Sequence, residues 1–384
     1  MASTKRPAHS IEPMTGMAQA NAPRPFSFAR RALAIVVLII AYASLRPFQG
    51  WRDPGRHPFA YLFAASPFGA PFDALLNVIG YLVLSLCLTL ALFPRIRGRW
   101  AFAIGVLGPA LGSVTVEAIQ TYLPGRFPSV IDVVMNTTGA MLGAAIAVWS
   151  TPWLADHRGG KHFRERWLVP GHVTEIGLLV LAGWFVALFA QRTILFGTGD
   201  FRGNFGATLD LGLPPIIYVV TEVYVVAANL VVAGLVLRLV ASDSVARVHW
   251  FLVLVAAAIA TRVIAQLTFW KIGAAFAWIT PEVLIGVISG TTVALLTLSL
   301  SRRAAAMTAL ALVATSLAVV NITPPDPALW LQSSAPRERM LIGLVLVARY
   351  TAKAWPLAAI VFLVMAAMPI ATRRSTLQES AQSP

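Results

Sequence analysis

Long apolar runs, separated by short polar connectors, follow one another along almost the whole chain. A helix that crosses the hydrocarbon core of a bilayer needs about 20 predominantly apolar residues. Runs of this kind predict an all-α integral membrane protein with about ten transmembrane helices, near residues 30–46, 72–94, 100–122, 130–150, 173–195, 214–240, 248–270, 276–300, 304–322 and 340–370.

The last predicted helix is longer than a single span requires. It contains Arg349, Lys353 and Pro356. It is therefore either one broken helix or an interfacial helix followed by a shorter span that begins near Ala354.

A polar connector that contains Pro152, Gly159 and Gly160 separates the first four predicted helices from the other six. Clusters of helix-breaking and polar residues of this kind mark boundaries between structural units. The N-terminal segment is rich in Pro, Ala, Ser and basic residues and lacks the apolar core of a signal peptide, which predicts a disordered tail. The predicted organisation is a cytoplasmic tail over 1–29, a four-helix membrane domain over 30–155, a cytoplasmic linker over 156–172, a second membrane domain of about six helices over 173–370 and a cytoplasmic tail over 371–384.

The distribution of charged residues predicts how the helices are oriented in the membrane. Charged residues make up 12% of the chain, about half of the roughly 25% found in soluble domains. The net charge of +14 comes mainly from Lys and Arg in the connectors, which argues against a nucleic-acid-binding surface and for a topology signal. About twice as many of these residues fall on the side of the N-terminus as on the other side, which predicts that both termini are cytoplasmic.

Three pairs of polar residues interrupt the apolar pattern at the predicted outer ends of consecutive helices. The members of each pair are three or four positions apart, so they share one helix face. A carboxylate inside a membrane span is costly unless it faces a protein interior or water, which makes these pairs a candidate site. The predicted ligand-binding residues are Asp73, Asn77, Glu117, Gln120, Arg126, Asp132 and Asn136. Arg126 is also the expected counter-ion of the carboxylates, and it could meet a phosphate or carboxylate of a ligand.

Helix capping is the alternative interpretation for the two aspartates. Asp73 lies at a helix start, and Ser129 to Asp132 fits a capping box. Glu117 does not fit this interpretation, because a carboxylate near the C-terminal end of its helix is disfavoured by the helix dipole. Asn77 and Asn136 lie one turn deeper, where hydrogen bonding between helices is an equally good explanation.

A second set of polar residues falls within the later apolar runs. It consists of Glu222, Arg262, Gln266 and Glu282. An ion pair between Arg262 and Glu282 or Glu222 would reduce the cost of burying these charges, and such a pair could serve only to hold helices together. The glycine-rich stretch from Gly197 to Gly206 follows a predicted membrane helix instead of a strand, so we interpret it as an outer loop and not a phosphate-binding turn.

The spacing of the first set resembles the VanZ-like membrane protein family over residues 31–150. The resemblance rests on Asp73-x-x-x-Asn77, Glu117-x-x-Gln120, Arg126, and Ser129-x-x-Asp132-x-x-x-Asn136-x-x-Gly139-x-x-x-Gly143, together with Leu45-Arg46-Pro47-Phe48. It implies a multi-pass protein of the bacterial inner (cytoplasmic) membrane and of the cell envelope. The family's namesake is linked to low-level resistance to teicoplanin, a lipid-bearing antibiotic, without an agreed biochemical activity.

The residues by themselves favour binding over a defined reaction. Metal-ligand spacing and a nucleophile elbow are both missing from the sequence, and Cys87 is the only cysteine, so we predict no metal and no cofactor. The leading hypothesis is an outward-facing site that recognises or processes a lipid-linked glycan or glycolipid, with Glu117 as the candidate acid or base if catalysis occurs. Membrane lipids, a lipid-linked saccharide and envelope-assembly proteins are the expected partners. The alternatives are a proton-coupled transporter or flippase, and a non-catalytic scaffold for envelope polysaccharide assembly.

Overall fold

The computed structural model describes residues 27–46, 48–63, 71–155, 166–169, 171–191, 193–202, 213–242, 247–323 and 341–368. Within these ranges the regular elements are ten α-helices and two short 3-10 helices, with one isolated β-bridge between Leu168 and Ala241. Eight of the α-helices are long and apolar enough to cross a membrane. The predicted all-α membrane architecture is therefore confirmed. Residues 1–26 of the predicted N-terminal tail, the linker residues 156–165 and the whole predicted tail 371–384 lie outside the described residues.

The first four helices are close to the predicted apolar runs. Because helices α2 and α4 pack together along much of their length, small residues are needed between them. A Cβ atom on Gly139 would lie 2.2 Å from the Val78 carbonyl oxygen, and one on Gly143 would lie 2.2 Å from that of Leu82. The helices are α1 (Ser27–Leu45), α2 (Pro71–Leu92), α3 (Gly98–Gln120) and α4 (Val130–Ala155).

The second group consists of six helices, and α7 (Pro215–Val240), which contacts α6, α8, α9 and α10, is its most buried member. Of its most apolar segment, 78% is buried, against 39% or less in each of the other long helices. An apolar helix buried on nearly all sides forms the core of its bundle. Helix α12 (Ile342–Ala367) is one continuous helix with Pro356 inside it, so the described part of the last apolar run contains no separate interfacial helix. The other four are α6 (His172–Ala187), α8 (Arg247–Phe269), α9 (Pro281–Thr297) and α10 (Arg302–Ile322).

Two of these helices are shorter than predicted. Helix α6 ends at Ala187 and not near 195, and α9 begins at Pro281 and not near 276. Thr280 accepts a hydrogen bond from the Val283 N–H and Pro281 has no N–H to satisfy, which together fix the start of α9. The chain after Ala187 continues as irregular structure.

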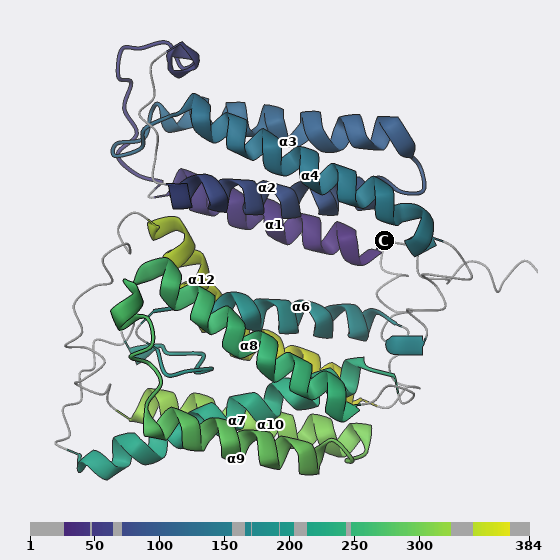
Figure 1. The fold of residues 1–384 in the computed structure, drawn as a ribbon, viewed down its shortest axis with the longest axis vertical. Helices are drawn as coiled ribbons and strands as arrows, with labels where there is room; N and C mark the ends of the chain where they lie inside the picture. Colours follow the sequence, from purple (N-terminus) through teal and green to yellow (C-terminus); the bar gives the residue numbers. More distant parts are fainter. Residues whose placement is uncertain are drawn as a thin grey trace, which may run out of the picture.

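The first four helices form one group and the other six form a second group beside it, with most helix axes running in a similar direction (Figure 1). Helices α1 and α12 meet between the two groups, where the Tyr42 and Tyr350 rings pack edge to face at 5.7 Å. Near the N-terminal end of α1, Arg31 pairs with Glu175 of α6 at 2.9 Å. The interface is therefore partly aromatic and partly ionic.

Candidate functional site

Polar side chains from α2, α3 and α4 gather between these three helices. Each helix contributes two residues separated by four positions, so both members of a pair lie on the same helix face. We call this group the polar cluster; it consists of Asn77 and Tyr81 on α2, Ser113 and Glu117 on α3, and Asp132 and Asn136 on α4.

Two hydrogen bonds between side chains of the cluster connect α4 to its neighbours. Asn77 Nδ2 donates to Asp132 Oδ1 at 2.8 Å, and Asn136 Nδ2 donates to Ser113 Oγ at 2.8 Å. Asn136 is 5% exposed, and its Oδ1 atom is buried with no hydrogen-bond partner. Buried polar atoms are nearly always paired, so this oxygen is an acceptor available to a ligand or water.

Glu117 lies at the end of α3 and is only 4% exposed. Its Oε2 atom accepts a hydrogen bond of 2.8 Å from the backbone N–H of Ser129, the residue that precedes α4. The carboxylate therefore lies at the positive N-terminal end of the next helix, which compensates for its unfavourable place at the end of its own helix.

The predicted capping box at the start of α4 forms only in part. Ser129 Oγ accepts a hydrogen bond from the Ile131 N–H at 3.1 Å, as an N-cap serine should. The Ser129 N–H, however, donates to Glu117 and Asp132 accepts from Asn77. Capping therefore does not account for the Asp132 side chain.

Arg126 holds the α3–α4 turn against the end of α1. Its Nη2 atom donates to the Ala43 carbonyl at 2.7 Å and its Nε atom donates to the Arg46 carbonyl at 3.3 Å. Burial lowers the pKa of Arg126, and the nearby Glu117 carboxylate opposes that shift without cancelling it. The guanidinium thus acts on Glu117 through space, while its hydrogen bonds go to carbonyls that have no partner within α1.

Two further residues enclose the cluster. Gln120 Nε2 donates to the Ser44 carbonyl of α1 at 2.9 Å. Tyr61 lies in the 3-10 helix η1 (Ala60–Leu62) of the connector, and its hydroxyl donates to the Val114 carbonyl of α3 at 3.1 Å. Burial raises the pKa of Tyr61, and the charge of Glu117 raises it further, so the connector reaches the neighbourhood of that carboxylate.

The structure brings together most, but not all, of the residues singled out in the sequence. Asn77, Glu117, Asp132 and Asn136 meet in the cluster, and Asp73 lies in the first turn of α2 with a side chain outside the described part. Ser113, Tyr81 and Tyr61 were not predicted. Helical spacing could have identified Ser113, which precedes Glu117 by four residues, and Tyr81, which follows Asn77 by four.

The second predicted set is not gathered in the same way. Arg262 is 4% exposed, and its Nη1 atom donates to the carbonyls of Leu188 at 2.9 Å and Ala190 at 2.8 Å. In the described part of the chain it forms no ion pair with Glu222 or Glu282. Gln266 is buried one turn further along α8. The described residues also contain no group of three or more His, Cys, Asp or Glu side chains placed to hold a metal ion.

The first part of the chain is similar to a known protein family. Residues 19–156 match the family model described as VanZ/LLP1, a range that includes all of α1, α2, α3 and α4 and the whole polar cluster. No curated protein and no solved structure matches the chain.

Proposed function

We propose that the first four helices, which match the VanZ/LLP1 family model, form a VanZ-like domain that uses its polar cluster to bind the head group of a lipid-linked glycan or glycolipid. The supporting observation is that the cluster contains buried acceptor oxygens, one of which has no hydrogen-bond donor. Glu117 and Asn136 are both more than nine-tenths buried, and Asn136 Oδ1 has no donor. Carboxylate and amide oxygens in this state are suited to ligands rich in hydroxyl or amine donors.

The surroundings of the cluster suit a ligand with a lipid chain. Large apolar side chains on the same helices face outward, including Ile79, which is 48% exposed, and Val134, which is 52% exposed. In a membrane such faces contact lipid tails. A head group in the cluster could therefore remain attached to a chain that lies along the outer face of the bundle.

The cellular setting is part of the same proposal. A cytoplasmic N-terminus would place the cluster near the outer surface of a bacterial inner membrane, where lipid-linked envelope precursors are used. Binding of such a molecule would alter susceptibility to teicoplanin-type antibiotics, because these antibiotics carry a lipid and act at that surface. Catalysis is not part of the proposal, because the cluster supplies a candidate acid or base, Glu117, and no identified nucleophile.

Native mass spectrometry of the purified protein with its co-extracted lipids tests this function. The informative variants are Glu117→Gln and Asp132→Asn, since each keeps an oxygen that can accept the observed hydrogen bond from Ser129 or Asn77. Loss of a charge-assisted hydrogen bond costs about 1.5–3 kcal/mol, so we expect retained glycolipid to fall by about tenfold or more. Glu282→Gln, a carboxylate in the first turn of α9, is the matched control and should retain the wild-type amount.

This experiment and a flux measurement in reconstituted vesicles separate the alternatives. Equal glycolipid retention by wild type, Glu117→Gln and Glu282→Gln would contradict the proposal and favour a scaffold. Substrate flux in reconstituted vesicles that depends on Glu222 or Glu282, and not on Glu117, would favour a transporter or flippase.

A further inference from the structure

The chain after α6 runs through the interior of the second group of helices without forming a helix. Every described residue from Leu188 to Arg202 is buried or half-buried. The Gly199 N–H donates to the Ala352 carbonyl of α12 at 2.8 Å, and Asn321 of α10 bonds both the Gly199 carbonyl and the Phe201 N–H at 2.8 Å. Residues 197–202, which we predicted as an outer loop, are thus held between helices.

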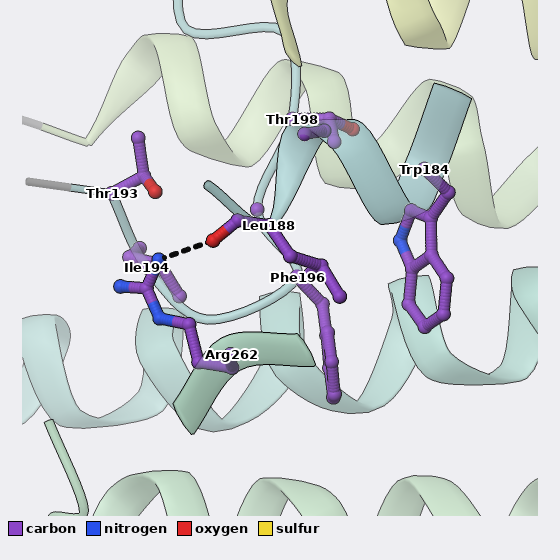
Figure 2. Close-up of a pocket in the computed structure, with 9 residues that line it drawn as sticks. Trp184, Leu188, Thr193, Ile194, Phe196, Thr198 and Arg262 are labelled. Atoms are coloured by element: carbon purple, nitrogen blue, oxygen red, sulfur yellow. Dashed lines mark hydrogen bonds between the residues drawn. The ribbon is translucent and has the colours of Figure 1, made fainter. Parts of the chain in front are cut away.

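Irregular backbone of this kind is tolerated inside a membrane protein only where the protein or a polar cavity satisfies it. A small pocket lies at this segment, between the end of α6 and α8 (Figure 2). The residues that line the pocket include Trp184, Leu188, Thr193, Ile194, Phe196 and Arg262. Among them, Phe196 has a backbone φ of 60°, a conformation that is unfavourable for a bulky side chain.

The unpaired polar atoms of the pocket are nitrogen donors. Both hydrogen bonds of the Arg262 guanidinium come from Nη1, and its Nε atom is buried with no partner. On the other side of Phe196 in Figure 2, the indole Nε1 of Trp184 is also buried without a partner, and the Trp184 side chain is fully buried. A buried N–H donor without a partner, such as Arg262 Nε, matches an occupant that accepts hydrogen bonds and does not match a cation.

Charge restricts the occupant further. Arg262 is 4% exposed, and its hydrogen bonds within the described chain go to two neutral carbonyls. A buried positive charge without a negative partner is costly in a low-dielectric interior. A water molecule would pair a donor but would leave the charge uncompensated. The pocket has room for about one water-sized group, which favours a small ion over phosphate, sulfate or a sugar.

We infer that this pocket binds a small monovalent anion of the chloride type, which accepts a hydrogen bond from Arg262 Nε and neutralises the guanidinium at the end of α6. The site lies in the second group of helices, outside the polar cluster, and does not depend on the function proposed for the VanZ-like domain. A bound anion would therefore link the irregular segment after α6 to Arg262 of α8.

Thermal unfolding of the full-length protein in detergent, at constant ionic strength with chloride or bromide replacing gluconate, tests the inference. We expect a saturable rise in Tm with chloride and with bromide. Arg262→Lys keeps a positive charge that can reach carbonyls but removes the Nε–H, and it should weaken the apparent halide affinity by about tenfold or more. Arg302→Lys is the matched control, since Arg302 also donates from its guanidinium to a carbonyl at a helix end, that of Leu239, and should leave the affinity unchanged.

A wild-type Tm that shows no saturable halide dependence would overturn the inference, as would a halide affinity that Arg262→Lys leaves unchanged. If Arg262→Lys does not fold, bromide-soaked crystals of the wild type locate the ion by anomalous scattering. A bromide peak within hydrogen-bond distance of Arg262 Nε supports the site, and a pocket that holds only water refutes it.

Discussion

Asn136 connects two helices and also exposes an unused acceptor to the interior of the polar cluster. Its Nδ2 atom bonds Ser113 while its Oδ1 atom has no partner. A double-mutant cycle of Asn136→Ala and Ser113→Ala should give a coupling energy of about 0.6 kcal/mol and at most about 1.7 kcal/mol, the average and the maximum measured for hydrogen bonds between membrane helices. Reversible unfolding in mixed micelles supplies the free energies. Strictly additive effects, within about 0.3–0.5 kcal/mol, would show that the two side chains do not interact.

Individual residues also show how far sequence reasoning reaches into the site. Helical spacing placed Asp132 and Asn136 on one face of α4, because that relation is fixed within a single helix. It could not identify Asn77 as the partner of Asp132, or the Ser129 N–H as the partner of Glu117. Those pairings depend on the rotation of one helix against another and on the path of a turn, which the periodicity of a single helix does not determine.

At the scale of helices, arginine side chains repeatedly satisfy the carbonyls at the C-terminal end of another helix. Such carbonyls have no partner within their own helix, and water is scarce inside a membrane protein. Arg30 donates to the Ala91 carbonyl at the end of α2, and Arg202 donates to the Thr323 carbonyl at the end of α10. Carbonyls at the C-terminal ends of three further helices accept hydrogen bonds in the same way: that of α1 from Arg126, that of α6 from Arg262 and that of α7 from Arg302. The charge pattern indicated orientation, and this second role became visible only in three dimensions.

The existence of the helices was predictable from the apolar runs, because a chain in lipid must satisfy its backbone within each span. The helix ends were less predictable. The start of α9 was marked in the sequence by Thr280 and Pro281, a typical N-terminal pattern. The end of α6 was not marked, since the carbonyls there are bonded by Arg262, which is more than 70 positions away in the chain.

Replacement of a glycine at the contact between α2 and α4 tests how closely these two helices pack. Gly143→Ala would place a methyl group against the Leu82 carbonyl, and overpacking of this kind costs about 1–3 kcal/mol. Gly112→Ala on α3 is the control, because its added Cβ meets no atom within 4 Å; higher helix propensity should make it neutral or stabilising by up to about 1 kcal/mol. Unfolding free energies of both variants decide the point. A Gly143→Ala protein as stable as Gly112→Ala would contradict the close approach of α4 to α2 at this glycine.

For the whole molecule, the sidedness of the connectors remains a prediction from charge. Because Cys87 is the only cysteine, single cysteines can be introduced into a Cys87→Ser background and labelled with a membrane-impermeant maleimide. We expect Asp53→Cys, in the connector after α1, to react in intact cells, and Lys161→Cys, between α4 and α6, to react only after the cells are permeabilised. The opposite pattern would place the polar cluster on the cytoplasmic side and rule out an outward-facing site.

The most direct test of the proposed function is photo-crosslinking with a lipid-linked saccharide that carries a diazirine on its sugar. If the polar cluster binds the head group, crosslinks should map to α3 and α4 between Ser113 and Asn136. They should decrease by about tenfold in Glu117→Gln, in line with the loss of one charge-assisted hydrogen bond, and persist in Glu282→Gln. Crosslinks that fall mainly on the second group of helices, or that Glu117→Gln leaves unchanged, would contradict the account.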